Sequence, residues 1–130
     1  MKVALCQINT IVGNLNYNKE KILKYYKRSI EKGSNLAIFP ELAITGYPPQ
    51  DLLCEKLFIE ESIKIVKEIS RISTIPLILG YVREKEKKIY NSAALCYDGK
   101  IRYIYDKILL PTYDVFDEKR YFTSGRIPSI

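Results

Sequence analysis

The sequence predicts an α/β fold in which strands and helices alternate along the chain. Three features indicate this: short apolar runs typical of buried strands, longer segments with apolar residues at helical spacing, and two strand-like runs joined by Asp98-Gly99. Such alternation favours a sheet with helices packed on it. The chain has 130 residues, 47% of them hydrophobic, so it can form one domain, or part of one, around a core.

The first third of the chain is predicted to form a strand, a helix and a second strand. Lys2 to Ile8 is apolar on both faces, which is typical of a central strand in a covered sheet. Asn14 to Asn18 supplies turn and N-cap residues for a helix that ends at Gly33. Leu36 to Phe39 is a short buried strand. The apolar positions of the helix are Ile22, Leu23, Tyr26 and Ile30.

A second helix and three further strands are predicted next. Asp51 is placed to cap this helix. Ile75 to Val82 is the next strand, and Lys85 to Lys88 is a charged loop. Ser92 to Tyr97 and Ile101 to Tyr105 form a hairpin, because the two residues between them are a strong turn signal. The apolar positions of the helix are Leu57, Ile59, Ile63, Val66, Ile69 and Ile72.

The predicted order is therefore β-α-β-α-β followed by a hairpin, with irregular chain after Tyr105. Pro111, Gly125 and Pro128 interrupt this last segment, residues 106 to 130. A compact domain rarely ends on a long loop that leads to no further element. We therefore expect residues 1–130 to be the N-terminal part of a domain whose remainder is absent.

Composition argues against several classes of function. The formal net charge is +6, but acids and bases are interspersed, as in REKEKK at 83–88, which predicts a solvated face and not a nucleic-acid surface. No apolar run is long enough to span a membrane, and the N-terminus resembles a strand more than a signal peptide. The three cysteines are widely spaced, which favours a reducing, cytoplasmic location.

The absence of histidine restricts the possible chemistry. Any general base in this chain must be Glu, Asp, Lys or Tyr. Glu41 follows the second predicted strand and Lys107 follows the last one, and ligands of open α/β sheets gather beyond the carboxyl ends of strands. Placed together in apolar surroundings, an acid and an amine would keep each other charged. Taken alone, Glu41 could be a turn carboxylate and Lys107 a surface lysine.

Five motifs together resemble the nitrilase, or carbon–nitrogen hydrolase, superfamily. They are CQINTIVGNLNYN, GSNLAIFPE, FPELAITGYPPQDLL, IYNSAALCYDGKI and DKILLPTYDVFDEKRYF. The resemblance spans essentially the whole chain. TGYPPQDLL and LPTYDVFDEKRYF make it closest to the glutaminase domain of glutamine-dependent NAD synthetases. The resemblance implies a four-layer αββα sandwich, here incomplete, and assembly into a homo-oligomer.

The resemblance also implies roles for individual residues. Glu41 of FPEL matches the general base of the family, and Lys107 of DKILLP matches its catalytic lysine. Glu118 of FDEKRYF matches the second glutamate, which supports the lysine. Tyr47 of TGYPP and Tyr113 of LPTY match tyrosines that line the glutamine pocket. Without the resemblance, Glu118, Tyr47 and Tyr113 would be interpreted as solvated or packing residues.

The family's nucleophilic cysteine has no counterpart in this chain. Cys6 and Cys96 lie in predicted strands, where cysteine behaves as a small apolar residue. Cys54 lies at the predicted start of a helix, where a thiolate would be favoured, but it matches no family nucleophile. The resemblance thus implies the glutamine amidohydrolase portion of a longer enzyme that releases ammonia to amidate deamido-NAD, with this segment inactive alone.

No cofactor or metal is expected for this segment. ATP and magnesium are implied only for the synthetase domain, its partner in the parent chain, and neither nucleic acid nor membrane is an expected partner. Two other interpretations stay open: a non-catalytic scaffold or regulatory fragment with the same fold, or another amide or nitrile hydrolase of the superfamily.

Overall fold

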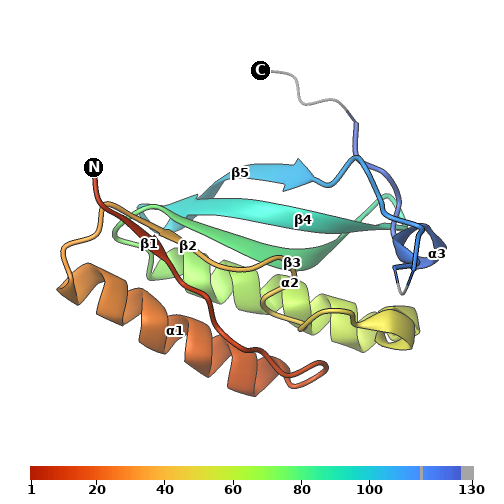
Figure 1. Cartoon of the computed structure of the whole chain (residues 1–130), viewed down its shortest axis with the longest axis horizontal. Helices are drawn as coiled ribbons and strands as arrows, with labels where there is room; N and C mark the ends of the chain where they lie inside the picture. The colour runs from red at the N-terminus through yellow and green to blue at the C-terminus, as the bar shows by residue number, and fades with distance from the viewer. Residues whose placement is uncertain (115, 127–130) are drawn as a thin grey trace.

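A mixed sheet of five strands, with two long helices on one face, forms the body of the molecule (Figure 1). The computed structural model describes residues 1–114 and 116–126. Strands β1, β2 and β3 are parallel, whereas β3, β4 and β5 are antiparallel neighbours, in the order β1-β2-β3-β4-β5. The predicted α/β class and order of elements are confirmed. Pro128, predicted to lie in irregular chain, is outside the described residues.

The bounds of the elements follow the chain. They are β1 (Val3–Leu5), α1 (Leu15–Glu31), β2 (Leu36–Ile38), the 3-10 helix η1 (Gln50–Cys54), α2 (Lys56–Arg71), β3 (Leu77–Lys85), β4 (Lys88–Tyr97), β5 (Lys100–Asp106) and α3 (Glu118–Tyr121). The short helix α3 lies in the segment that the sequence predicts to be irregular.

Helix α1 forms where its caps and periodicity predict. The side chain of Asn14 accepts a hydrogen bond from the backbone N–H of Tyr17, and Gly33 follows the helix with a φ of 70° that favours glycine. The hydroxyl of Tyr26 donates to the carbonyl of Ile75 over 2.7 Å and accepts from two backbone N–H groups, so it fixes α1 against the start of β3.

The start of the second helix differs from the prediction. Asp51 does not cap α2, because the chain first makes the separate turn η1 and then extends at Glu55. Asp51 instead accepts a hydrogen bond of 2.6 Å from the hydroxyl of Tyr121. The buried face of α2 includes Ile65, which the predicted stripe omits, and two of the predicted apolar positions are exposed, Leu57 and Ile72.

Two tight turns join the last three strands. Asp98 and Gly99 have φ values of 52° and 71°, as a two-residue hairpin turn requires, so this predicted hairpin is confirmed. The predicted charged loop Lys85–Lys88 is a second such turn, because Glu86 and Lys87 have φ values of 53° and 61° while Lys85 pairs with Lys88. No glycine or asparagine marks this turn, so the sequence gives no turn signal there.

The two faces of the sheet have different environments. On the helix side, β3 and β4 bury Leu79, Tyr81 and Cys96 against α1 and α2. On the other side the described residues provide no covering layer, and Figure 1 shows both long helices beneath the sheet. The sequence predicts a central strand over Lys2 to Ile8. The structure instead has the three-residue strand β1 at the edge of the described sheet, and Leu5 is 69% exposed. One helix layer and one sheet layer are thus present, which is part of a sandwich.

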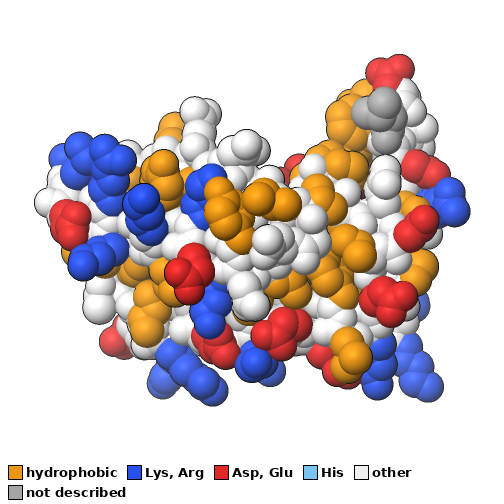
Figure 2. Space-filling model, turned by 90° about the horizontal axis from the view of Figure 1, so that it is seen from below, with side chains coloured by type: hydrophobic (Ala, Val, Ile, Leu, Met, Phe, Trp, Pro, Cys, Tyr) orange, Lys and Arg blue, Asp and Glu red, His pale blue; other side chains and the backbone are white. Residues whose placement is uncertain are grey.

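The outer side of the helices carries both signs of charge. Figure 2 shows lysine and arginine side chains mixed with aspartate and glutamate over this face. Such mixing is typical of a solvated helix surface. Within the described ranges, no helix combines the length and apolar character that crossing a bilayer requires.

Asn18 of α1 connects this helix to the loop that precedes it and to the loop after β2. Its side chain is fully buried, accepts from the N–H of Ile11 at 2.8 Å, and donates to the carbonyls of Ile11 and Ile44. Gly46 allows this junction to close, because a Cβ on it would lie 2.7 Å from the Cα of Val12. The buried side-chain amide of Asn18 therefore fixes the loop after β2 to α1.

Asn18→Leu should lower the free energy of unfolding by about 2–4 kcal/mol, because the buried carbonyl of Ile44 and the partly buried N–H and carbonyl of Ile11 would lose their partner. Urea denaturation of the protein measures this. Asn16→Leu, at an exposed position of the same helix, is the control and should change the value by less than about 0.5 kcal/mol. Equal effects of the two substitutions would contradict the structural role of Asn18.

Candidate active site

The loop after β2 carries Glu41 across β3 at Gly80. Gly80 of β3 makes this crossing possible, since a Cβ there would lie 2.4 Å from the backbone nitrogen of Leu42 and 2.6 Å from the carbonyl oxygen of Pro40. Real Cβ atoms do not approach backbone so closely, so any larger residue would displace the loop. The short β2 and the glycine together place Glu41 beside β4.

Lys107 reaches the same edge from the other end of the sheet. Strand β5 runs in the same direction as β2, because two antiparallel pairings separate β5 from β3 and β3 is parallel to β2. The carboxyl ends of β2 and β5 therefore lie at one edge. The backbone of Lys107 is fixed there: its N–H donates to the carbonyl of Asn91 at 2.8 Å, and its carbonyl accepts from the N–H of Gly125 at 2.9 Å.

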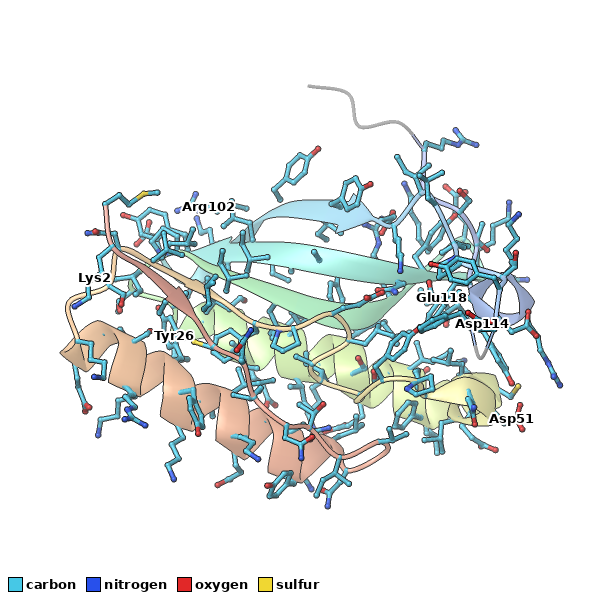
Figure 3. All side chains as sticks on the ribbon, viewed as in Figure 1. Lys2, Tyr26, Asp51, Arg102, Asp114 and Glu118 are labelled. Atoms are coloured by element: carbon cyan, nitrogen blue, oxygen red, sulfur yellow. The ribbon has the colours of Figure 1, made fainter. Side chains whose placement is uncertain are left out.

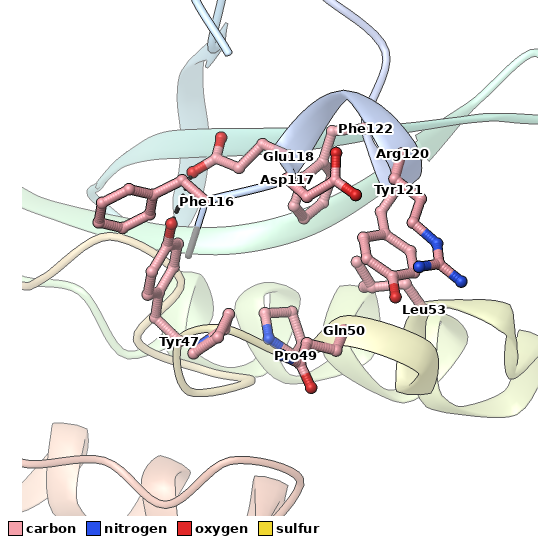
Figure 4. A pocket seen from close by; sticks show the side chains of 11 residues that line it. Tyr47, Pro49, Gln50, Leu53, Phe116, Asp117, Glu118, Arg120, Tyr121 and Phe122 are labelled. Carbon is pink, nitrogen blue, oxygen red and sulfur yellow. Dashed lines mark hydrogen bonds between the residues drawn. The ribbon is translucent and has the colours of Figure 1, made fainter. Parts of the chain in front are cut away.

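The ammonium of Lys107 lies between two carboxylates. Its Nζ is 2.8 Å from Oε1 of Glu41 and 3.1 Å from Oε1 of Glu118. Two neutral groups complete the cluster: the Asn91 amide donates to Oε1 of Glu41 at 2.6 Å, and the Tyr47 hydroxyl donates to Oε1 of Glu118 at 3.0 Å (Figure 4). Residues 41, 47, 91, 107 and 118, distant in sequence, are thus one connected set.

Glu118 is much more deeply buried than the other carboxylate of the cluster, Glu41. It begins α3 beside the end of the sheet (Figure 3), and its side chain is only 5% exposed, whereas that of Glu41 is 46% exposed. Within residues 1–114 and 116–126, Oε2 of Glu118 is buried without a hydrogen-bond partner. A buried carboxylate needs compensation, and here Lys107 and Tyr47 supply it.

The charges of the cluster alter the titration of two of its groups. Partial burial acts to lower the pKa of Lys107, but the hydrogen bonds and charges of Glu41 and Glu118 outweigh this and raise it above its ordinary value. Burial, followed by the hydrogen bond to Glu118, also raises the pKa of Tyr47. The lysine therefore stays an ammonium and the tyrosine a neutral donor at physiological pH.

Tyr113 lies farther from the charged groups than Tyr47 does. Its ring is 65% exposed and meets the ring of Phe116 edge-on with centroids 5.8 Å apart; Phe116 in turn lies 6.2 Å from the ring of Tyr47. These aromatic rings form a wall beside the cluster. A cavity of about 130 Å³, shown in Figure 4, lies between this wall and η1, with Pro49 and Tyr121 among its lining residues.

A second hollow opens on the uncovered face of the sheet. It has a volume of about 330 Å³ and brings Glu41, Asn91 and Lys107 together with the apolar side chains of Phe39 and Tyr105. A mostly apolar hollow with a few convergent polar groups is the form of a small-molecule site. The predicted residues Glu41 and Lys107 both contribute to it.

Two of the three cysteines are buried and one is exposed. Cys6, which follows β1, and Cys96 of β4 are buried, and burial raises the pKa of both thiols, that of Cys96 to about 11. Cys54, predicted to lie at the start of a helix, is exposed and is the last residue of η1, two positions before α2 begins. Within the described part of the chain, none of these three cysteines forms a hydrogen bond with Glu41 or Lys107. No group of three metal-binding side chains occurs there either.

Three residues of the site are not singled out by the sequence analysis. Asn91 lies inside the motif IYNSAALCYDGKI, just before the predicted strand Ser92 to Tyr97, and no role is predicted for it. A polar residue at the start of an otherwise apolar run is a signal that could have identified it. Gly80 and Phe116 give no such signal, because their roles depend on which loop and which ring lie opposite them.

A lysine shared between two carboxylates thus lies at the carboxyl edge of an α/β sheet, in a chain without histidine. The family model described as carbon-nitrogen hydrolase matches residues 2–130, and the chain belongs to this family.

Relatives with this fold include NAD synthetases and an amidase. The chain is 40% identical over 131 residues to a glutamine-dependent NAD(+) synthetase of Aquifex aeolicus, covering 98% of the chain and 23% of the relative. A solved glutamine-dependent NAD+ synthetase from Acinetobacter baumannii matches with a TM-score of 0.91 and 36% identity, over 96% of this chain and 24% of that one. An amidase from Nesterenkonia sp. matches with a TM-score of 0.84 and 25% identity, over 98% and 49%.

The matched region is a minor part of the synthetases. The chain spans 22–24% of the length of the synthetases that it resembles, and about half of the amidase. The nitrilase fold of these neighbours agrees with the predicted sandwich, of which this chain forms a part.

The raised pKa of Lys107 predicts a specific alkaline loss of stability. Below about pH 10.5 the lysine is charged in both the folded and the unfolded protein, so its ion pairs stabilise fully. Above that pH the unfolded lysine releases its proton first, and the contribution is lost as the pH rises through the folded pKa. Urea denaturation across this range should show a smaller decline for Lys107→Met than for the wild type.

Lys100→Met is the matched control, because Lys100 is exposed at the first residue of β5, the strand that Lys107 follows. It should keep the alkaline decline of the wild type. If Lys107→Met declined as steeply as this control, the ion pairs of Lys107 would not be the cause.

Proposed function

We propose that this chain supplies the general base, the lysine and the second glutamate of the glutamine-hydrolysing site of a glutamine-dependent NAD synthetase. The observation that carries the proposal is the ammonium of Lys107 held between Glu41 and Glu118. Its support is the match to NAD synthetases at 35–40% identity over nearly the whole chain. The nucleophile would be a cysteine from elsewhere in a longer polypeptide.

Glu41 would act first, as the base. It accepts the proton of the cysteine thiol, and the resulting thiolate attacks the side-chain amide carbon of glutamine. The carbonyl oxygen becomes an oxyanion, which needs a donor. Lysine has three N–H donors, and Glu41 and Glu118 occupy two of those of Lys107, so the third can stabilise the oxyanion.

The intermediate would then collapse with release of ammonia. Protonated Glu41 returns its proton to the amide nitrogen, the carbon–nitrogen bond breaks, and a glutamyl thioester remains. Water attacks the thioester while Glu41 takes a proton from it, and the departing sulfur recovers that proton as glutamate leaves. The sum is glutamine plus water to glutamate plus ammonia.

Glu118 and the tyrosines would hold this arrangement in place. Glu118 fixes the ammonium of Lys107 from the side opposite Glu41, and Tyr47 fixes Glu118. Tyr47 and Tyr113, linked through Phe116, would line the glutamine pocket. Precise orientation of this kind contributes much of the rate of amide hydrolysis.

Amidation of deamido-NAD would belong to another part of the same polypeptide. That part would use ATP and magnesium and would consume the ammonia released here.

In the full-length protein, Lys107→Met should lower the kcat of glutamine hydrolysis about 100-fold or more, because the oxyanion loses its donor. Ammonia release from glutamine measures this. Lys100→Met and Cys54→Ala should keep near wild-type activity, since neither side chain bonds to Glu41 or Lys107. Loss of activity in Cys54→Ala would instead identify Cys54 as the nucleophile. Wild-type hydrolysis of other carboxamides but not glutamine would favour an amidase.

A further inference from the structure

Asn91 contacts both members of the Glu41–Lys107 pair. It lies near the start of β4, opposite Val82 of β3, and is only 4% exposed. Its backbone carbonyl accepts the N–H of Lys107 at 2.8 Å, and its side-chain Nδ2 donates to Oε1 of Glu41 at 2.6 Å. One buried strand residue thus bonds to the backbone that presents the lysine and to the side chain of the base.

The orientation of the Asn91 amide is determined by its partner. A carboxylate accepts hydrogen bonds and donates none, so only the NH₂ group of Asn91 can face Glu41. A hydrogen bond to an ionised group is stronger than one between neutral groups. Because β4 lies between β3 and β5 with long pairings on both sides, the donor is held on a rigid element.

Asn91 and Lys107 both bind the same oxygen of Glu41. In the described part of the chain, every hydrogen bond to this carboxylate goes to Oε1, from Asn91 at 2.6 Å and from Lys107 at 2.8 Å. Two donors leave little capacity on Oε1 to accept a further proton. Oε2 keeps its lone pairs, and Glu41, with its side chain 46% exposed, lines the hollow on the uncovered sheet face.

We propose that Asn91 is a positioning residue that orients Glu41 so that Oε2 is its proton-accepting atom. The proposal rests on the proposed glutamine hydrolysis. Lys107 alone could rotate with Glu41, since both are side chains that follow strand ends. Asn91 restricts this rotation, because its side chain bonds to Glu41 and its backbone is fixed in β4. Its loss should therefore reduce the chemical step more than the binding of substrate.

Asn91→Leu and Asn91→Asp test this in the full-length protein, because both keep the branched shape of the side chain, with the same number of heavy atoms, and the backbone bond to Lys107. Asn91→Leu should lower kcat for glutamine about 10-fold or more, with KM changed less than about threefold. Asn91→Asp should lower kcat further, since it replaces the donor with a second carboxylate. A kcat of Asn91→Leu within about twofold of the wild type would overturn the proposal.

Ser62→Ala is the matched control for local destabilisation. Ser62 is buried on the helix side, and its hydroxyl bonds to the carbonyl of Val82, the residue opposite Asn91 in β3. This variant should keep kcat within about twofold of the wild type. An equal loss of kcat in Ser62→Ala and Asn91→Leu would overturn a specific role for Asn91.

A thermal measurement separates this inference from the proposed function. The decrease in Tm caused by Asn91→Leu should be smaller by about 2 °C or more in a Glu41→Gln background, because the charged acceptor is already absent. If the wild type does not hydrolyse glutamine but this coupling is present, the proposed function fails and the positioning of Glu41 stands. If the two substitutions are additive in Tm, the positioning of Glu41 by Asn91 is wrong.

Discussion

The shared ammonium of Lys107 is the interaction on which the site depends. Two carboxylates close together repel each other, and Glu118 is almost fully buried, so neither position is favourable without a cation. Lys107 compensates both acids at once. The same arrangement leaves Glu41 partly accessible and gives the lysine two fixed partners and one remaining donor.

The fold meets this requirement by bringing three chain segments to one edge of the sheet. The loop after β2 crosses β3 only because Gly80 has no side chain, and Lys107 follows β5 at the same edge because β2 and β5 run in the same direction. Glu118 comes from the short helix α3, beyond both. The buried amide of Asn18 holds the loop of Glu41 from the side opposite the charges.

Much of this was predictable from the sequence, and the reasons differ between residues. The alternation of strands and helices, the cap of α1 and the Asp98-Gly99 turn are local patterns, so they predict their elements correctly. Glu41 and Lys107 were predictable because each follows a strand end, and the structure brings them into contact. Their catalytic roles, and those of Glu118, Tyr47 and Tyr113, stay predictions from the family resemblance.

The features that the sequence did not predict depend on distant partners. Asp51 is a residue type that commonly caps helices, but its carboxylate accepts a hydrogen bond from the hydroxyl of Tyr121, 70 positions later. The Glu86-Lys87 turn forms without the usual turn residues, because the long pairing of β3 with β4 brings Lys85 and Lys88 together. Both faces of β1 are apolar, which predicts a central strand, whereas β1 lies at the edge of the described sheet with Leu5 exposed.

The most direct measurement is an experimental structure of the full-length protein after reaction with an electrophilic glutamine analogue. The account predicts a covalent adduct on a cysteine other than Cys6, Cys54 or Cys96. The former amide oxygen should lie within hydrogen-bond distance of Lys107 Nζ, and the sulfur beside Oε2 of Glu41. An adduct on one of those three cysteines, or a Lys107 separated from both Glu41 and Glu118, would contradict it.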